Sequence, residues 1–359
     1  MGNVHIARRG RPLGRGVASR RLGAAAVAAG LLLAGGATAC SSSGGSTSAG
    51  ASPGSVASGN VTNVSDVTLN VGDQAGAGSQ ALLTAAGLLS KLPFKVKWSD
   101  FTSGPPMLQA MSAGSVDIGS VGDAPPIFAA AGGAKIAAVG ATESDPDAEA
   151  ILVAKNSPIK TVAELKGQTI AVSQGSAAHY HLLATLKQAG LTIKDVKPDY
   201  LQPADAEAAF AAGHVAAWDV WSPYIEAAEH QYNARVLVNG QTSGTVYSFV
   251  IASRAALGDA AKAAAIRDYL KVLEQADAWA KANPSKWSAT WAKAFGLPGA
   301  VTSQAVKDDV ATPVAIDSSV ISSEQNVANA FTSAGLIPSH VDFNDYVVQT
   351  YNSLVGSAG

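Results

Sequence analysis

Cysteine is nearly absent from this sequence of 359 residues, which contains a single one, Cys40. One thiol excludes a disulfide scaffold, and it excludes a zinc or iron–sulfur site built from several thiolates. Long apolar runs are scarce as well. The only long uncharged one, residues 22–39, has about the length of a signal-peptide core with its cleavage site. A multi-span membrane protein is therefore excluded.

Basic residues are few after residue 39. Residues 1–39 contain six arginines and no acid, so the rest of the chain has 19 of the 25 bases against all 27 acids, a net charge of −8. Nucleic-acid binding requires a basic surface, and we therefore expect no nucleic-acid partner. Hydrophobic residues make up 47% of the chain, enough for a sizeable core, and the length suggests about two domains.

The first 65 residues have the order of an export signal followed by a tether. An arginine-rich start, an apolar core and small residues predict a signal peptide over residues 1–39. The stretch that ends at Cys40 resembles a bacterial lipobox, although Ala37 stands where that motif favours Leu, and it implies that Cys40 is lipidated. Residues 40–65 are rich in Gly and Ser and predict a flexible tether. We expect a lipid-anchored protein on the outer face of the cell membrane, in the periplasm of a Gram-negative cell; the alternative is a soluble secreted protein.

Strand and helix patterns alternate from Val67 onward. Alternation of this kind predicts an α/β fold with mostly parallel sheets and helices on both faces. Near the C-terminus, residues 259–283 have helical periodicity, and Asn283-Pro284 is typical of the start of another helix. The expected strands are 67–71, 94–98, 116–121, 135–140, 151–155 and 168–173, and helices are expected over 79–90 and 176–189.

Small residues and glycines lie between several strand ends and helix starts. In a doubly wound sheet such loops gather at the carboxyl edge, where helix N-termini offer free N–H groups and the positive end of the helix dipole to an anion. After residue 39 the chain has only three arginines, none of them in these loops, which favours a tetrahedral monoanion held by neutral donors. The loops are 72–81, 103–106, 122–126 and 174–179.

The first of these loops also fits another motif. Gly76-x-Gly78-x-x-Ala81 follows a strand, as in a dinucleotide-binding fingerprint. The pyrophosphate turn needs its first glycine at the strand end, and here that glycine lies five residues beyond Val71. A ligand loop that brings Gln74 and backbone amides to the site is the better interpretation.

Aromatic residues surround an acid in the segment 218–224. On a strand, Asp219 and Trp221 would point to one side and Trp218 to the other. Trp221 could then contact an apolar ligand tail, while Asp219 could accept from an amine or join two parts of the fold. The alternative is that both tryptophans lie in the core and Asp219 in a turn.

Catalytic patterns are poor. His179 and His181 are two residues apart and do not share a helix face, so they make a weak metal pair, and we expect neither a metal site nor a cofactor. No motif of a nucleophile with an adjacent base is present, so no catalytic residue is assigned. An exported hydrolase that uses His179 and Asp219 is the alternative from a different functional class.

Five segments together resemble the substrate-binding proteins of bacterial ABC importers for aliphatic sulfonates, within the nitrate/sulfonate/taurine group. The likeness runs from about Val67 to Pro338. The segments are Ser103-Gly104-Pro105-Pro106, Gly122-Asp123-Ala124-Pro125-Pro126-Ile127-Phe128, Glu149-Ala150-Ile151-Leu152-Val153, Gly175-Ser176-Ala177-Ala178-His179-Tyr180 and Trp221-Ser222-Pro223-Tyr224.

The resemblance implies the two-lobed periplasmic-binding-protein fold (type II), with residues 66–150 and 248–359 in lobe 1 and 151–247 in lobe 2. Two strands of a hinge would cross between the lobes near 151–155 and 248–253. The pocket positions that it implies are Gln74, Gly104, Asp123, Ser176, Ala177, His179 and Trp221, to which Asp219 is added from the strand argument above.

The function that the resemblance implies is that of a solute receptor, not an enzyme. It would bind a small aliphatic sulfonate and deliver it to an ABC permease and its ATPase subunit as a sulfur source, and we expect a monomer. Receptors for nitrate, bicarbonate, taurine or a thiamine-pyrimidine precursor are alternatives with the same fold. The family usually has Asp where this chain has Ser222, which leaves a taurine-like aminosulfonate in question unless Asp219 substitutes.

Overall fold

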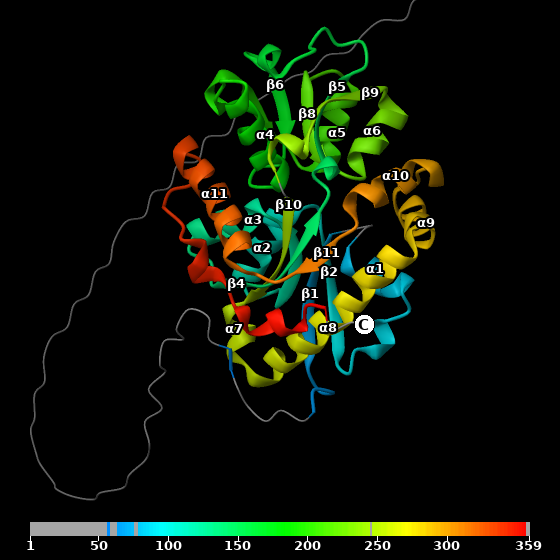
Figure 1. The fold of residues 1–359 in the computed structure, drawn as a ribbon, viewed down its shortest axis with the longest axis vertical. Coiled ribbons are helices and arrows are strands. Elements are labelled where there is room, and N and C mark those ends of the chain that lie inside the picture. The colour runs from blue at the N-terminus through cyan, green and yellow to red at the C-terminus, as the bar shows by residue number, and fades with distance from the viewer. Residues whose placement is uncertain (1–55, 58–62, 75–77, 245, 357–359) are drawn as a thin grey trace, which may run out of the picture. The chain divides into compact units, whose positions relative to one another are not determined.

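The computed structural model describes residues 56–57, 63–74, 78–244 and 246–356 (Figure 1). Cys40 and the predicted signal peptide lie outside these residues, and their assignment stays a prediction. Within the described residues, strands form two separate sheets, and helices pack on both. None of the helices in the described ranges combines the length and the apolar character that a membrane crossing requires.

The six-stranded sheet has the order β11-β4-β10-β3-β1-β2. Strand β1 pairs in parallel with β2 and β3, whereas β10 runs antiparallel between β3 and β4, and β11 runs antiparallel to β4. Its strands are β1 (Thr68–Gln74), β2 (Lys95–Phe101), β3 (Ile118–Gly122), β4 (Ile136–Ser144), β10 (Val246–Ser253) and β11 (Thr312–Val314).

The five-stranded sheet has the order β7-β6-β8-β5-β9. Strand β6 pairs in parallel with β7 and β8, and β5 lies antiparallel between β8 and β9. Its strands are β5 (Glu149–Ala154), β6 (Thr169–Val172), β7 (Lys197–Tyr200), β8 (Ala217–Trp221) and β9 (Ala234–Asn239).

The α/β class is confirmed, but the sheets are mixed where mostly parallel sheets were predicted. The reason is the path of the chain between them. It leaves the six-stranded sheet after β4 and enters the other through a short 3-10 helix, Pro146–Ala148, and it returns after β9 through a second one, Gly240–Thr242. The strands that receive these crossings run antiparallel to both of their neighbours, β5 to β8 and β9, and β10 to β3 and β4.

The crossings themselves also differ from the prediction. Residues 151–155 and 248–253 were expected to cross between lobes, but most of them are hydrogen-bonded members of β5 and β10. An apolar run marks a buried strand and does not reveal where the chain changes sheet. The assignment of residues to two lobes stays a prediction.

Helices cover both sheets (Figure 1). Helices α4, α5 and α6 pack on the five-stranded sheet, and α1, α2, α3, α7 and α8 pack on the six-stranded one. The helices are α1 (Ser79–Ala85), α2 (Gly104–Ser112), α3 (Ala124–Ala131), α4 (Ala177–Gln188), α5 (Pro203–Ala211), α6 (Tyr224–Tyr232), α7 (Arg254–Gly258), α8 (Ala260–Ala282), α9 (Pro284–Phe295), α10 (Gly299–Asp309) and α11 (Ser318–Ala334).

Local sequence sets the ends of the C-terminal helices. The Asp259 carboxylate accepts from the amides of Ala261 and Lys262 and starts α8, while Pro284 opens α9, where a missing N–H group costs nothing. On α9, Trp287 and Trp291 are 5% and 1% exposed, and truncation of a tryptophan buried to this extent costs about 3–5 kcal/mol. Both predicted helices are confirmed.

Candidate functional site: a cavity lined from both sheets

Residues from both sheets line one cavity of about 480 Å³. The strand residues come from β1, β2, β3, β4, β5, β8 and β10, and the helix residues come from α1, from the first turns of α2, α4, α5 and α6, and from α8 and α9. Among the eight ligand-binding residues predicted from the sequence, those that line the cavity are Gln74, Gly104, Ser176, Ala177 and Trp221.

Helix N-termini supply most of the polar backbone of the cavity. Gly104 is the first residue of α2, Ala177 of α4, and Pro203 of α5, and all three line the cavity. Amides in a first helical turn have no acceptor within their own helix, and the helix dipole places partial positive charge there. This end of the cavity is therefore suited to the oxygens of an anion.

The polar side chains at this end are neutral. Ser176 donates from its hydroxyl to the carbonyl oxygen of Ser173 at 2.7 Å, which fixes the hydroxyl at the start of α4. The Gln74 amide donates to the carbonyl of Ser120 at 3.2 Å, so both of these cavity residues are held in place. Among the described residues that line the cavity there is no Lys, Arg or His.

Carboxyl groups line the cavity instead: Asp73, Asp100, Glu149, Asp277 and Asp309. Burial raises the pKa of Glu149 to about 8, and Asp123 and other acids nearby add to the rise. Burial likewise raises the pKa of Asp309 to about 7 and that of Asp277 to about 8. Near neutral pH Glu149 and Asp277 are therefore mostly protonated and Asp309 is partly protonated, so the cavity carries less negative charge than its five carboxyl groups would give if all were ionised.

The acid Asp73 has a structural partner. Its carboxylate oxygens accept from the amides of Ser79 at 2.7 Å and of Gln80 at 3.0 Å, and so it caps α1. Burial raises the pKa of Asp73 to about 6 against the lowering effect of these amides.

Elements of the two sheets come into close contact where β3 ends and α4 begins. A Cβ atom added at Gly122 would lie 2.9 Å from the Cβ of Ala177, closer than real Cβ atoms come. Similarly, a Cβ at Gly104 would lie 2.7 Å from Cγ of Pro125. Glycine is therefore required at both positions for this packing around the cavity.

Hydrogen bonds also join the two sides. The side-chain oxygen of Gln202, the residue before α5, accepts from the hydroxyls of Thr102 and Ser103 at 2.8 Å each. Ser103 is 1% exposed and immediately precedes α2. Gln202 was not among the predicted site residues, although a polar side chain directly before a helix-starting proline was a usable signal.

Trp221 and Trp218 lie in different surroundings, as the strand alternation predicted. Trp221 lines the cavity and packs edge-on against Tyr224, with ring centroids 6.0 Å apart. Trp218 is 1% exposed and contacts the ring of Phe210 on α5. One tryptophan thus belongs to the core and the other to the cavity wall.

His179 does not line the cavity, in contrast to the prediction. It is fully buried, its Nδ1 accepts from the Gly175 amide at 3.1 Å, and its ring packs against Phe128 and Phe331. Burial lowers the pKa of His179 to about 4, so the ring is neutral at physiological pH. The imidazole faces α3 and α11 because it lies on the inner face of α4, one turn from the helix start.

Asp219 is also placed away from the cavity, in an ion pair with His181 at 2.9 Å in which both side chains are fully buried. Burial alone would lower the pKa of His181, but the Asp219 carboxylate outweighs it and raises the pKa to about 9. The imidazole also contacts the carbonyl oxygen of Asn239 at 3.1 Å. His179 and His181 therefore face different parts of the molecule, and within the described residues no group of three potential ligands is placed to hold a metal ion.

Asp123 is the third predicted residue that does not line the cavity. Its carboxylate accepts from the amide of Ala124 at 2.6 Å and caps α3, and the side chain is 6% exposed. Burial raises the pKa of Asp123 to about 7. Because this carboxylate occupies the start of α3, that helix offers its N-terminus to an anion less freely than α2 and α4 do.

Comparison with known proteins places the chain in a family. Residues 102–287 match the family model described as NMT1/THI5 like. The aliphatic sulfonates-binding protein of Escherichia coli (strain K12) is 40% identical over 284 residues, which cover 78% of this chain and 88% of that protein.

Solved structures agree with this relationship. The alkanesulfonate-binding protein SsuA from Xanthomonas axonopodis pv. citri bound to MOPS has a TM-score of 0.73 and 36% identity, and covers 79% of this chain and 98% of its own. The periplasmic aliphatic sulphonate binding protein SsuA from Escherichia coli has a TM-score of 0.69 and 40% identity, with 79% and 92% covered. The chain therefore belongs to the NMT1/THI5-like family, in which its relatives are the aliphatic sulfonate-binding proteins.

Proposed function

We propose that this protein is an extracytoplasmic receptor that binds an aliphatic sulfonate in the cavity and delivers it to an ABC permease for uptake as a sulfur source. The observation that carries the proposal is the cavity itself, in which the N-termini of α2, α4 and α5 meet neutral hydroxyl and amide side chains. The relatives that share 36–40% of the sequence are named as sulfonate-binding proteins, which supports the same ligand class.

A sulfonate fits this arrangement because its three oxygens share one negative charge. The Gly104 amide at the start of α2 and the amides in the first turn of α4 donate to the oxygens, and the dipoles of both helices favour the charge. The aromatic rings of Trp221 and Tyr224 are available to an alkyl group at the cavity wall. Neutral donors bind such a monoanion without an arginine fork, which suits planar carboxylates better.

Binding is coupled to closure in this proposal. The donors come from both sheets, so a ligand gains its full set of contacts only when the sheets approach as they do at Gly122 and Ala177. A ligand shifts the equilibrium between open and closed forms only by the difference in its affinity for the two forms. This difference is large here, because the open form offers the donors of one sheet only. The permease would then recognise the closed form.

No chemical step follows binding in this proposal. The alternative of an exported hydrolase required His179 and Asp219 to act together, whereas Asp219 pairs with His181 and His179 accepts from a backbone amide. The signal peptide and the lipidation of Cys40 that the sequence predicts support a receptor outside the cytoplasm and at the membrane, where an importer collects its solute.

Titration calorimetry tests the proposal with methane-, ethane- and butanesulfonate against nitrate and sulfate. We expect micromolar or tighter binding of at least one alkanesulfonate, about 8 kcal/mol or more. A Trp221→Ala variant should weaken butanesulfonate more than methanesulfonate, because only the longer ligand reaches the aromatic wall. The absence of heat with every sulfonate, or tighter binding of nitrate, would overturn the assignment.

A further inference from the structure

A tight turn leads from β6 into α4. The Ser176 amide donates to the carbonyl oxygen of Ser173 at 3.1 Å and closes the turn, inside which Gly175 adopts a positive φ of 73°. Ser176 and Ala177, which follow directly, line the cavity. The turn therefore sets the direction in which the first amides of α4 meet a ligand.

His179 holds this turn from within α4. Its Nδ1 accepts from the buried amide of Gly175 at 3.1 Å, and a buried amide without an acceptor is costly, so the imidazole fixes the orientation of this peptide group. Because an N–H group donates to Nδ1, the ring proton is on Nε2, which lies 3.4 Å from the hydroxyl of Tyr200. The hydrogen bond to Gly175 thus requires the neutral ring.

The same imidazole lies where elements of the two sheets meet. α4 packs on the five-stranded sheet and α3 on the six-stranded one, and α11 contacts both helices (Figure 1). The centroid of the His179 ring is 6.0 Å from that of Phe128 on α3 and 5.2 Å from that of Phe331 on α11. Phe128 also contacts the turn, since a Cβ atom added at Gly175 would lie 3.0 Å from its Cγ. Packing of α3 on α4 therefore supports the turn and excludes water from His179.

A proton added to Nδ1 would disrupt this arrangement. The new N–H group would face the N–H group of Gly175, and the ring would carry its charge at a fully buried position. Burial lowers the pKa of His179 from 6.5 to about 4, and the ring regains its ordinary pKa when α3 separates from α4 and admits water. The closed form therefore loses stability relative to the open form as pH falls from 6.5 towards 4.

Neighbouring acids do not offset that charge. Burial raises the pKa of Asp123, at the start of α3, to about 7, and it raises the pKa of Glu324 on α11 well above its ordinary value, so both carboxyl groups are protonated at pH 5. At this pH the nearby tyrosines are neutral, Glu149 is protonated and Asp219 is paired with His181. The other titratable groups on α4 and on the strands beside it are Tyr180 and His181 on α4, Glu149 on β5, Tyr200 on β7 and Asp219 on β8.

We propose that His179 is a positioning residue of the sulfonate site, whose neutral imidazole holds the turn before α4 against α3, and whose protonation opens the cavity and releases the ligand. This inference rests on the proposed function and adds a release mechanism to it. His179 acts without touching the ligand, because the turn passes its state on to Ser176 and Ala177 in the cavity wall.

Calorimetric affinities for butanesulfonate at pH 7 and pH 5 test this role in four forms of the protein. They are the wild type, His179→Asn, His179→Phe and the control His214→Asn. An asparagine offers an acceptor near the position of Nδ1 that cannot be protonated, whereas a phenylalanine keeps a ring without the acceptor. His214 is an exposed histidine in the loop after α5.

We expect the affinity of the wild type, relative to that of His179→Asn, to fall about tenfold or more from pH 7 to pH 5. His214→Asn should follow the wild type. At pH 7, His179→Phe should bind at least about fivefold more weakly than His179→Asn, because only phenylalanine leaves the Gly175 amide without an acceptor. A role in packing alone predicts the reverse order, since phenylalanine fills the space of the imidazole.

Equal pH dependence of the wild type and His179→Asn would overturn the proposal and leave the proposed function intact. Failure of every sulfonate to bind the wild type at pH 7 would instead overturn the proposed function.

Nitrogen NMR of histidine-labelled wild-type protein keeps the test valid if the His179 variants do not fold. His181 is identified by its charge, since it is paired with Asp219, and His214, His230 and His340 are exposed. With butanesulfonate bound, we expect one further ring to stay neutral, with its proton on Nε2, down to pH 5, and the same ring to become charged at pH 5 in the ligand-free protein. A ring that titrates equally in both forms would refute the link between His179 and closure.

Discussion

Gln202 accepts a 2.8 Å hydrogen bond from the hydroxyl of Ser103, so the residue before α5 is joined directly to the residue before α2. Gln202 lies in the loop after β7 of the five-stranded sheet, and Ser103 lies in the loop after β2 of the six-stranded one. Thr102 donates to the same oxygen of Gln202, also at 2.8 Å. One side chain therefore links the two halves of the cavity beside the helix starts that we assign to the sulfonate.

Replacement of Gln202 by Ala should weaken sulfonate binding about ten- to thirtyfold. Each hydrogen bond contributes about 1 kcal/mol, and both are present only when the two halves are together. Calorimetry with butanesulfonate measures the affinity, and thermal unfolding checks that the fold is intact. Gln109→Ala, an exposed change on α2, is the control, and an equal effect of the two substitutions would contradict a specific link.

The contact between Gly122 and Ala177 gives a sharper test of closure. Gly122→Ala places a Cβ atom 2.9 Å from that of Ala177, a clash that separation of the halves relieves. We expect at least about tenfold weaker binding with little change in thermal stability, because the open form is unaffected.

A second substitution makes that result specific. Removal of the opposing Cβ in the double variant Gly122→Ala/Ala177→Gly should restore much of the lost affinity, whereas Ala177→Gly alone should have a small effect. If the double variant binds no better than Gly122→Ala, the loss does not arise from this contact.

Much of the fold could be predicted from local patterns, because buried strands and amphipathic helices have recognisable periodicities. The direction of the strands could not be predicted in this way. β10 has the same apolar character as β3 and β4 between which it lies, and only the long-range pairing makes it antiparallel. β7 (Lys197–Tyr200) is an edge strand with mostly exposed side chains, so it has no apolar pattern to detect.

The site was predictable where it depends on helix starts, since glycines and prolines mark them in the sequence. Gly104 and Ala177 were identified in this way. Side chains whose role depends on tertiary partners could not be predicted from the sequence. Asp219 and His179 resemble ligand residues in sequence but are satisfied by His181 and by a backbone amide, whereas Asp277 interrupts an apolar helix face, a signal that only the cavity makes meaningful.

The buried pair of His181 and Asp219 should be a major contributor to stability. Asp219→Asn removes the carboxylate that raises the pKa of His181 to about 9, so burial then favours the neutral imidazole and the charged contact in the core is lost at neutral pH. Loss of one partner of a buried ion pair costs about 3–5 kcal/mol. Urea unfolding at pH 6 measures the loss.

The pH dependence of the same pair has a defined sign. Because the folded-state pKa of His181 is raised from 6.5 to about 9, its contribution is complete below pH 6.5 and declines as pH rises through 9. The difference in unfolding free energy between wild type and Asp219→Asn should therefore shrink as pH rises from 6.5 to 9. A difference that grows with pH would contradict the assignment of charge.

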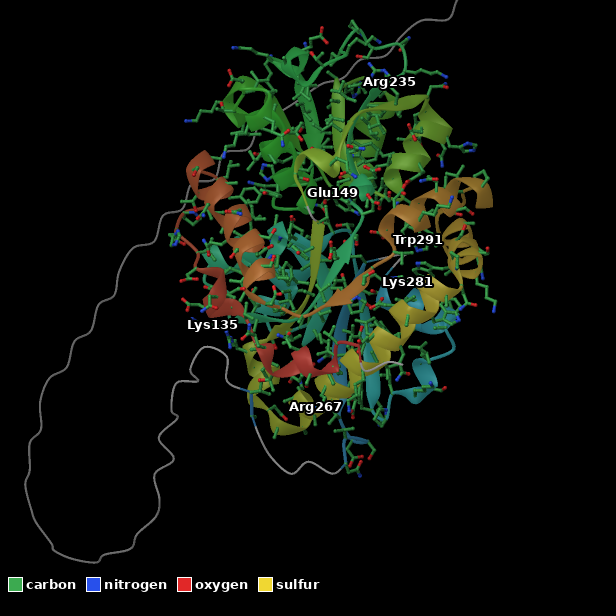
Figure 2. All side chains as sticks on the ribbon, in the orientation of Figure 1. Lys135, Glu149, Arg235, Arg267, Lys281 and Trp291 are labelled. Atoms are coloured by element: carbon green, nitrogen blue, oxygen red, sulfur yellow. The ribbon has the colours of Figure 1, made fainter. Side chains whose placement is uncertain are left out.

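Glu149 gives a pH effect on binding that a Glu149→Gln variant isolates from the effects of the other acids in the cavity. It lines the cavity, and Figure 2 shows it at the junction of the two sheets. Burial raises the pKa of Glu149 to about 8, so the group is neutral below that pH and adds a negative charge to the cavity above it. Affinity for butanesulfonate, which has no cation, should fall as pH rises through 8 in the wild type, and Glu149→Gln should reduce the fall.

Stability should reveal the same titration independently of the ligand. The pKa of Glu149 is raised in the folded state from 4.5 to about 8, so the folded protein binds the proton more tightly and loses stability relative to Glu149→Gln between these pH values. In thermal unfolding, the stability of Glu149→Gln relative to the wild type should increase from pH 5 to pH 8 and stay constant above pH 8. A constant difference over that range would mean that Glu149 is already ionised at pH 5, and the predicted change in affinity would then lose its cause.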